Sequence, residues 1–283
     1  MSGKTYEKAK AVVEAARAEP EKYEPLVEQM DTSGKVDRAF KTLRAEQRRD
    51  ADERLAAETD AAQPGDRARS VQPGEWWALG DHRLFCGDST SVEFVNAVDQ
   101  AAFAFADPPY GADAAEWDEA FVWDHDWLSD RAAVVAVTPG VVNVFRFAKL
   151  TAMPYRWTFT CWINNGMTRG DMGFGNTILV PLFSHGSIYR NTQDFMQVSI
   201  SVAETSQTDH RGRKPTGLVA RLMELYSAEG ESVVDPFLGS GTTLLVAEKL
   251  GRRCVGAEIV PDFCSQIIAR WEALTGQIAE VVP

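Results

Sequence analysis

Residues 232–243 read SVVDPFLGSGTT. The apolar run that ends at Asp235 predicts a buried strand, the two glycines predict a tight turn, and the amphipathic residues 244–250 predict a helix. Strand, glycine turn and helix in this order form the first βα unit of a nucleotide-binding α/β fold. The stretch therefore predicts a ligand site at the carboxyl end of this strand.

The glycine turn also narrows the chemistry of that ligand. Gly239 and Gly241 let the backbone approach a ligand closely, and helix N-terminal amides with the hydroxyls of Thr242 and Thr243 can hold a carboxylate. The next predicted strand ends at Glu258, an acid placed to accept ribose hydroxyls. The turn lacks the three-glycine dinucleotide pattern, which argues against a nicotinamide or flavin enzyme. One ribose, one carboxylate and no pyrophosphate fit S-adenosylmethionine better.

A second motif, Asp107-Pro108-Pro109-Tyr110, follows an apolar run over 101–106 that predicts a buried parallel strand. The motif suits enzymes that methylate an exocyclic amino nitrogen, such as that of adenine or cytosine. This amino group is a poor nucleophile, because its lone pair is delocalised into the ring. A carboxylate and the Pro108 carbonyl can each accept one N–H bond and align that lone pair toward an electrophilic methyl. The prolines stiffen the backbone, and Tyr110 offers a ring on which a base taken out of its stack can lie. A proline-rich turn without chemistry is the alternative.

Together these motifs make the chain similar to the DNA amino-methyltransferases of the permuted β group, in which Asp-Pro-Pro-Tyr precedes the cofactor motif. The resemblance runs from about Trp76 to Gly276. It rests on residues 79–84, 86–88, 107–111, 210, 214–215, 226–227, 235–243, 256–258, 270–272 and 274–276. It implies S-adenosylmethionine, a flipped base and direct transfer without a covalent enzyme intermediate.

The resemblance also implies a set of site residues. The catalytic ones are Asp107, Pro108, Pro109 and Tyr110. The cofactor-binding ones are Asp88, Lys214, Pro215, Asp235, Phe237, Gly239, Ser240, Gly241, Thr242, Thr243 and Glu258. Asp88 is expected near the cofactor adenine, and Lys214 and Pro215 in the segment over its methionine. Plainer alternatives are a turn residue for Asp88, a solvated charge for Lys214 and a strand-end acid for Glu258.

The fold class expected is α/β, with a doubly wound, mostly parallel, seven-stranded sheet of the Rossmann-like methyltransferase type, circularly permuted and carrying an N-terminal helical appendage. The strands are expected at 82–86, 101–106, 132–137, 155–163, 177–183, 232–234 and 253–257, and a helix over 141–150. The strands before Asp107 and Asp235 are expected to be central neighbours, so that both ligands meet where the strand order switches. The strands at 155–163 and 177–183 are expected to form a hairpin at the sheet edge.

Three regions are expected along the chain. Residues 1–60 form the helical appendage, 61–74 with two Pro-Gly pairs form a linker, and 75–283 form the catalytic domain. Short target-recognition segments are expected at about 164–176 and 186–209. In the appendage, helices are expected over 5–18, 21–30 and 35–58. It resembles, more weakly, the tail of ParB-like domains, through Glu19-Pro20 and 32–36; a dimer or partner helix and a solvated remnant are both open.

The net charge of −12 is unfavourable for binding DNA, since affinity for DNA depends largely on neutralising phosphates. Residues 146–214, however, carry eight basic and four acidic side chains, so that the excess of positive charge lies in the middle of the chain. The candidate nucleic-acid-binding residues there are Arg169, Arg190, Arg211 and Arg213. Ordinary solvated charges are the alternative. The acidic total predicts weak, salt-sensitive binding of double-stranded DNA, or help from a partner.

Composition excludes several other classes. The four cysteines are dispersed without a Cys-x-x-Cys pair, and the four histidines show no ligand spacing, so no metal is expected. No Pro-Cys dipeptide occurs, which argues against cytosine C5 methylation through a thiolate. No apolar run reaches membrane-spanning length and no signal-peptide pattern begins the chain. A cytoplasmic protein without membrane contact is expected.

The function expected is DNA methylation at N6 of adenine, which the resemblance favours because Asp rather than Ser stands before Pro-Pro-Tyr. N4 of cytosine stays open, as does methylation of RNA or of a protein glutamine, although the latter enzymes usually carry Asn in place of Asp107. A non-catalytic regulatory or partition-type DNA-binding protein is an alternative of another class, and the intact pairing of the two motifs opposes it. A homodimer is a family expectation. The enzyme could be an orphan or belong to a restriction-modification system, and no restriction partner is indicated.

Overall fold

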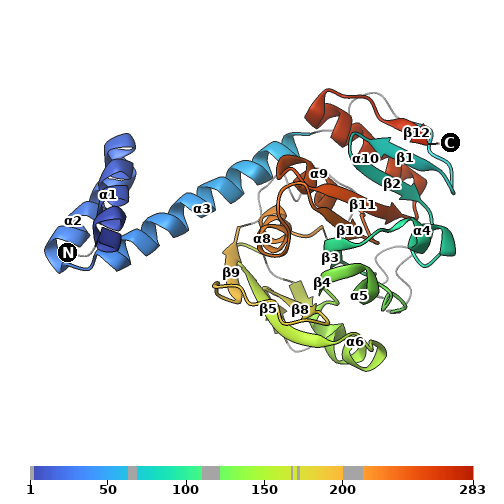
Figure 1. The fold of residues 1–283 in the computed structure, drawn as a ribbon, viewed down its shortest axis with the longest axis horizontal. Helices are drawn as coiled ribbons and strands as arrows, with labels where there is room; N and C mark the ends of the chain where they lie inside the picture. Colours follow the sequence, from blue (N-terminus) through green and yellow to red (C-terminus); the bar gives the residue numbers. More distant parts are fainter. Residues whose placement is uncertain are drawn as a thin grey trace. The chain divides into compact units, whose positions relative to one another are not determined.

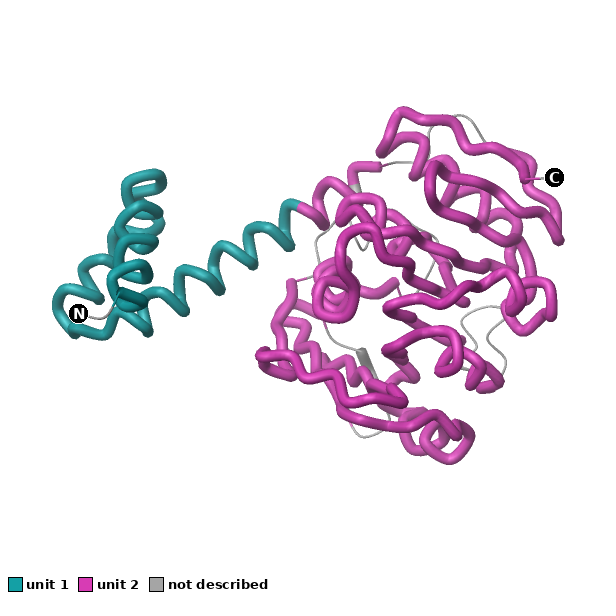
Figure 2. The backbone as a smooth tube through the Cα atoms, viewed as in Figure 1, with its two compact units in different colours: residues 1–54 teal, residues 55–283 magenta. Residues whose placement is uncertain are grey.

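The computed structural model describes residues 3–62, 69–109, 122–166, 168–170, 173–199 and 213–282. The chain divides into two compact units, residues 1–54 and residues 55–283 (Figure 2). Tyr110 and Arg211 lie outside the described residues. Within the described residues, no helix is long and apolar enough to cross a membrane.

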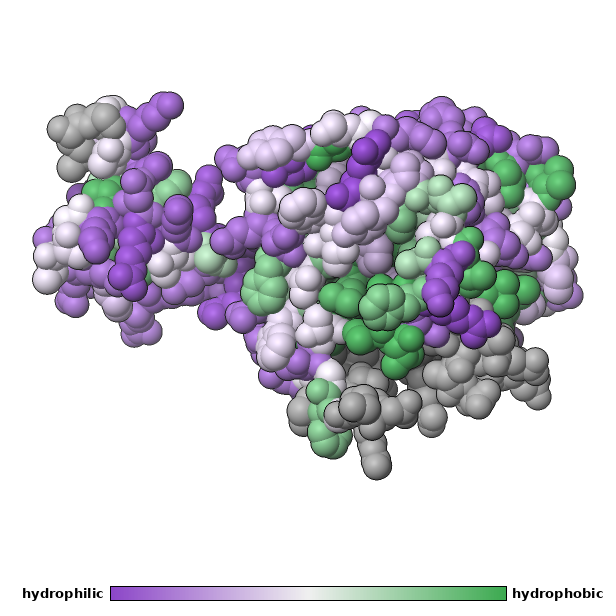
Figure 3. Space-filling model, turned by 90° about the horizontal axis from the view of Figure 1, so that it is seen from below, coloured by the Kyte–Doolittle hydropathy of each residue, from purple (hydrophilic) through white to green (hydrophobic). Residues whose placement is uncertain are grey.

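Unit 1 is helical, as expected. It contains α1 (Gly3–Ala18), α2 (Pro20–Ser33) and the first part of α3 (Val36–Ala61). Pro20 stands at the start of α2, where its missing N–H costs nothing, and Gly34 ends the helix with a left-handed φ of 66°. The helices enclose a small core that includes Val12, Tyr23 and Leu43. Most of the visible face of unit 1 in Figure 3 is hydrophilic, as the many charges of α3 predict.

The main sheet of unit 2 has a parallel centre. Its middle strands are, in spatial order, β2 (His82–Cys86), β11 (Arg253–Glu258), β10 (Ser232–Asp235), β3 (Ala101–Ala106) and β4 (Ala132–Val137). Each of these strands is parallel to its neighbour. On the far side of β4 lie β8 (Thr177–Phe183) and β5 (Tyr155–Ile163), an antiparallel pair.

The expected strand number of seven is wrong, because the described residues form a sheet of ten strands. The additional strands are β1 (Trp76–Leu79), β12 (Glu280–Val282) and β9 (Phe195–Val198). The sheet is therefore mixed, because β1 is antiparallel to both of its neighbours, β12 and β2. The hairpin is present, but β9 pairs with β5 and takes the edge position. The circular permutation stays a prediction.

The sheet is doubly wound, because each face packs against its own layer of helices (Figure 1). One core joins Phe103, Val134 and Val233 to α8 (Thr216–Tyr226), α9 (Thr242–Lys249) and α10 (Pro261–Thr275). The other joins the alternate strand residues, such as Ala104 and Val135, to α4 (Val92–Ala97), α5 (Leu128–Arg131) and α6 (Val144–Leu150). Continuous apolar strands such as β3 thus bury both of their faces.

The two motifs meet as expected. β10 and β3 are parallel neighbours, with Val233 opposite Phe103. From β10 the chain continues to β11 on one side, whereas β3 continues to β4 on the other. The strand order switches between β10 and β3, which is where open α/β sheets bind ligands. Asp235, which ends β10, and Asp107, which follows β3, leave the sheet side by side at this edge.

The expected loop 164–176 contains a small hairpin, β6 (Thr168–Gly170) with β7 (Gly173–Gly175). The backbone of Arg169 lies in β6, opposite Phe174. In the expected helix 141–150 the first turn is 3₁₀, over Val141–Asn143, before α6 begins.

Candidate functional site

The glycine turn has the left-handed backbone that its sequence predicts. Gly239 and Gly241 have φ of 51° and 81°, which favour glycine over any residue with a side chain. A Cβ at Gly241 would also lie 2.8 Å from Cγ1 of Ile267 on α10. α9 begins at Thr242, directly after the turn, and the first amide groups of a helix have no partner within it.

Glu258 ends β11 and braces this turn. Its Oε2 accepts the N–H of Gly239 at 2.8 Å, and its Oε1 accepts the N–H of Val260 at 2.8 Å. The N–H of Ile259 also interacts with this carboxylate, whose two oxygens offer about four acceptor positions, so the side chain can still accept a ribose hydroxyl. Burial raises the pKa of Glu258 to about 7, although the backbone N–H groups act in the opposite direction.

Asp235 is buried to 2% exposure at the end of β10. Its Oδ1 accepts the N–H of Phe237 at 2.8 Å. Burial is the main reason that the pKa of Asp235 rises to about 7, and the negative charges of Asp107 and Glu258 raise it further. The ends of β10, β3 and β11 therefore bring carboxyl groups close enough to repel one another.

Asp107 has a hydrogen-bond donor on each of its carboxylate oxygens. Its Oδ1 accepts the hydroxyl of Thr138 at 2.5 Å, and its Oδ2 lies 2.7 Å from Nζ of Lys214. Both Asp107 and Lys214 are largely shielded from solvent. Lys214 was expected over the cofactor methionine, and the structure places its ammonium on the predicted catalytic carboxylate. Pro108 is buried beside it and Pro109 is half-buried.

The segment before α8 touches both motifs. Arg213 donates from Nε to Oγ1 of Thr242 at 3.0 Å, and Pro215 is buried at the start of α8. Oγ1 of Thr242 also lies 3.2 Å from the hydroxyl of Ser240. Arg213 was expected to contact nucleic acid, whereas its side chain lies on the glycine turn of the predicted cofactor site.

Two of the candidate nucleic-acid-binding arginines, Arg190 and Arg213, have described side chains. Arg190 donates from Nε to the carbonyl of Leu225 at 2.6 Å, near the end of α8. Arg213 contacts Thr216, the first residue of that helix. The two side chains therefore lie at opposite ends of α8.

Asp88 lies two residues after β2, at the same edge of the sheet. Cys86 is opposite Glu258 in the β2–β11 pairing, and the N–H of Gly87 donates to the Glu258 carbonyl at 3.0 Å. Oδ1 of Asp88 accepts both the N–H and the hydroxyl of Thr90 at 2.8 Å. The side chain thus closes a turn, as its plainer interpretation predicts, beside the acid expected to hold the ribose.

Three further residues join this site without having been predicted. Thr138 contacts Asp107. His125 lies 2.8 Å from the hydroxyl of Ser89 through Nε2, and its ring centre is 4.5 Å from that of Phe237. Burial lowers the pKa of His125, which favours the neutral ring.

Arg270, on α10, donates to the carbonyl of Ser240 in the glycine turn. The resemblance includes residues 270–272, and this was the sequence signal available for Arg270.

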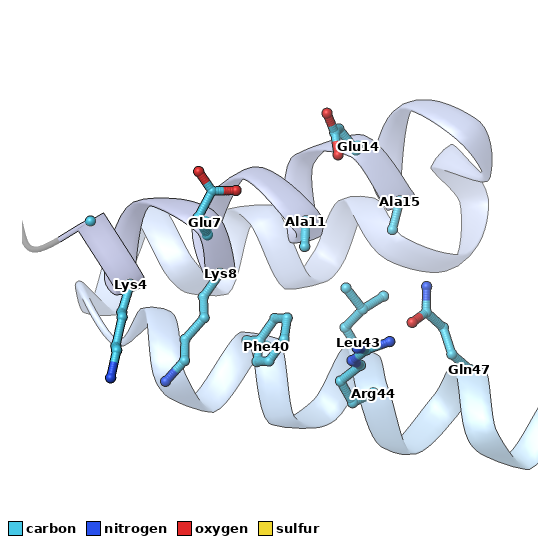
Figure 4. A pocket seen from close by; sticks show the side chains of 11 residues that line it. Lys4, Glu7, Lys8, Ala11, Glu14, Ala15, Phe40, Leu43, Arg44 and Gln47 are labelled. Atoms are coloured by element: carbon cyan, nitrogen blue, oxygen red, sulfur yellow. The ribbon is translucent and has the colours of Figure 1, made fainter.

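A pocket lies apart from this site, in unit 1 between α1 and α3 (Figure 4). Ala11, Ala15, Phe40 and Leu43 contribute apolar surface, and the charged residues lining it include Lys4 and Glu14. None of the predicted site residues lines it.

Comparison with known proteins finds similar sequences and similar folds. Residues 143–269 match a family model described as DNA methylase. Over 71 residues the chain is 38% identical to the type II methyltransferase M.ScaI of Streptomyces caespitosus. The aligned stretch covers 25% of this chain and 23% of that protein. Over 64 residues it is 39% identical to the type II methyltransferase M2.DpnII of Streptococcus pneumoniae, covering 23% and 24%. These matches span about a quarter of the length of the curated relatives.

Two solved structures share the fold. The crystal structure of the M1.HpyAVI–SAM complex aligns with a TM-score of 0.52 and 16% identity, over 66% of this chain and 97% of that chain. The PvuII DNA methyltransferase (cytosine-N4-specific) aligns with a TM-score of 0.50 and 17% identity, over 69% and 93%. At these identities the likeness concerns the fold alone, and it confirms an α/β fold of the methyltransferase type.

Proposed function

We propose that this protein is a DNA methyltransferase that transfers the methyl group of S-adenosylmethionine to the exocyclic amino group of a flipped base, with N6 of adenine as the target. The observation that carries the proposal is the meeting of two motifs at one edge of the sheet. Asp107 follows β3 and Asp235 ends the neighbouring β10. The match of residues 143–269 to the DNA methylase model supports the same reaction class.

S-adenosylmethionine is the cofactor, and the residues around the glycine turn fit it. Glu258 would accept the ribose hydroxyls, Asp88 would lie near the adenine, and the amides and hydroxyls at the start of α9 would hold the carboxylate. When bound, the cofactor supplies an electrophilic methyl group. The structure of the M1.HpyAVI–SAM complex, which has the same fold, is consistent with this assignment.

The role of the chain's own residues is to orient the nucleophile. Asp107 and the Pro108 carbonyl each accept one N–H of the target amino group, which directs the nitrogen lone pair out of the base plane. Lys214 holds the carboxylate that does this, at 2.7 Å. No strong general base is required, because the proton leaves after the nitrogen has become cationic.

The choice of adenine rests on Asp107, since the related enzymes with Asp at this position favour adenine. N4 of cytosine is the alternative, and the PvuII enzyme, which shares the fold, is cytosine-N4-specific. We propose double-stranded DNA as the partner and the cytoplasm as the compartment. We also propose that the protein forms a homodimer and that unit 1 is a remnant of a ParB-like domain.

A labelled digest tests the reaction and the base together. DNA of mixed sequence would be incubated with the protein and isotope-labelled S-adenosylmethionine, and its nucleosides would be resolved by mass spectrometry. Labelled N6-methyladenine is expected. Labelled N4-methylcytosine would keep the mechanism and overturn the choice of base, while label in RNA or protein controls alone would overturn the DNA substrate.

A pair of variants tests the role of Asp107. Asp107→Ala should abolish transfer while S-adenosylmethionine still binds by calorimetry. Asp99→Ala makes the same change near the opposite end of β3, where the side chain is exposed, and should leave transfer unchanged. Equal residual transfer in the Asp107 variant and the wild type would contradict the proposal.

A further inference from the structure

Thr138 is held beside Asp107 by the register of two strands. In the β3–β4 pairing Ala106 is opposite Val137, and the N–H of Thr138 donates to the Ala106 carbonyl at 2.9 Å. The parallel ladder therefore extends one residue beyond β4 and places Thr138 next to the first residue after β3. Thr138 precedes Pro139, which confines its backbone to extended conformations.

The hydroxyl of Thr138 donates to the Asp107 carboxylate. The residue is 0% exposed, and its Oγ1 lies 2.5 Å from Oδ1 of Asp107. The Ala106 carbonyl lies 3.5 Å from the same oxygen, so the carboxylate is much the nearer acceptor for the single hydroxyl proton. A length of about 2.5–2.7 Å is typical of a hydroxyl that donates to a charged oxygen.

Two donors to Asp107, Thr138 and Lys214, differ in how rigidly their side chains are held. Lys214 reaches Oδ2 through a flexible four-carbon stem, and an ammonium accepts many directions of approach. Thr138 is β-branched, so its χ1 is restricted, and its backbone is held in the sheet ladder. The plane of the carboxylate is therefore set from the β4 side, by the hydroxyl on Oδ1.

We propose that Thr138 is a positioning residue for methyl transfer, which holds Oδ1 of Asp107 and so fixes the plane in which the carboxylate accepts the target amino group. This inference rests on the proposed function. The attacking nitrogen, the transferred methyl carbon and the sulfur that the methyl leaves must lie in line. Rotating the carboxylate would therefore misdirect the nitrogen lone pair. Removing the hydroxyl should slow the chemical step without weakening cofactor binding.

Two variants of nearly the same shape test this proposal. Thr138→Val removes the donor and keeps the volume, whereas Thr138→Ser keeps the donor. In the full-length protein, kcat for DNA methylation should fall about 10- to 100-fold in the Val variant, as misalignment of a reacting group predicts. The Ser variant should keep kcat within about threefold of wild type, and the KM for DNA and the Kd for S-adenosylmethionine should stay within about twofold in both. Thr160→Val in β5, three strands away from β3 in the sheet order, serves as the control.

A second measurement does not depend on catalysis. Crystal structures of both variants should show the Asp107 carboxylate rotated in the Val protein and unmoved in the Ser protein. An unrotated carboxylate with wild-type kcat in the Val variant would overturn the proposal, as would a Ser variant as slow as Val. If the wild type transfers no methyl to DNA, the proposed function fails, and the rotation of Asp107 still decides whether Thr138 positions it. Thr138→Ala replaces the Val variant if that protein does not fold.

Discussion

A bound ligand can change the protonation of the carboxyl groups of Asp235 and Glu258. Burial raises the pKa of each to about 7, so both are partly protonated at neutral pH. A ribose hydroxyl that donates to Glu258 favours the ionised form, since an ionised carboxylate accepts more strongly. Cofactor binding should therefore release a proton near neutral pH.

This predicts a pH dependence of cofactor affinity. The affinity should increase as the pH rises from 6 to 8, because below its raised pKa Glu258 is protonated and must lose its proton to accept the ribose hydroxyls. The expected change is about tenfold per pH unit below the pKa. Glu258→Gln should bind S-adenosylmethionine more weakly and with a flatter profile, measured by isothermal titration calorimetry. Glu280→Gln, on the edge strand β12, is the control, and the same slope in both variants would contradict the assignment.

At the level of secondary-structure elements, the end of α3 supports the glycine turn. The last carbonyl groups of a helix have no partner within it. Arg270 on α10 donates to the carbonyl of Thr59 at 3.1 Å and to that of Ala62 at 3.4 Å, while it also donates to the carbonyl of Ser240. Arg270 is 3% exposed. The cation thus joins the carboxyl end of α3, which is favourable for positive charge, to the turn at the start of α9.

This interaction predicts that Arg270 contributes to cofactor affinity from behind the site. Arg270→Met keeps the length of the side chain and leaves the Ser240 carbonyl without this donor, so the turn should loosen. The Kd for S-adenosylmethionine should rise about tenfold or more, the effect expected from removing one hydrogen bond to a charged group. Arg69→Ala is the matched control, since it breaks the Arg69–Glu272 ion pair on the same helix without touching the turn. Melting temperatures would fall in both variants, and equal Kd values would refute the prediction.

At the scale of the whole molecule, the net negative charge of the protein opposes binding to DNA. The net charge is −12, although residues 146–214 carry an excess of positive charge. Arg190 and Arg213 lie at opposite ends of α8, and Arg213 donates to Thr242 directly after the glycine turn. DNA affinity should therefore be weak and steeply dependent on salt.

Arg190 is the described arginine best placed to test this. Arg190→Ala should weaken binding of a mixed-sequence DNA duplex and reduce the slope of log affinity against log salt by about 0.9 for each phosphate that the guanidinium neutralises. Filter binding or fluorescence anisotropy at several salt concentrations would measure it. Arg38→Ala in unit 1 is the control of equal charge. An unchanged slope would show that Arg190 binds no phosphate.

Local sequence determined the centre of the sheet. The strands 82–86, 101–106, 132–137, 155–163 and 177–183 have the expected bounds, because each is rich in apolar, aromatic or β-branched residues and is ended by residues that favour turns. The meeting of Asp107 and Asp235 followed from strand parallelism. In contrast, β9 and β12 are short and largely exposed, so no apolar pattern marks them, and only pairing with distant strands makes them part of the sheet.

The hydrogen bonds within the site were decided by tertiary structure. Lys214 is 107 positions from Asp107, Thr138 is 31 positions from it, and Arg270 is 30 positions from Ser240. Residue type and spacing identified which side chains carry chemistry, because those depend on local motifs. Which donor holds which carboxylate oxygen depends on strand order, register and helix packing, and these arise only when the whole chain buries its core.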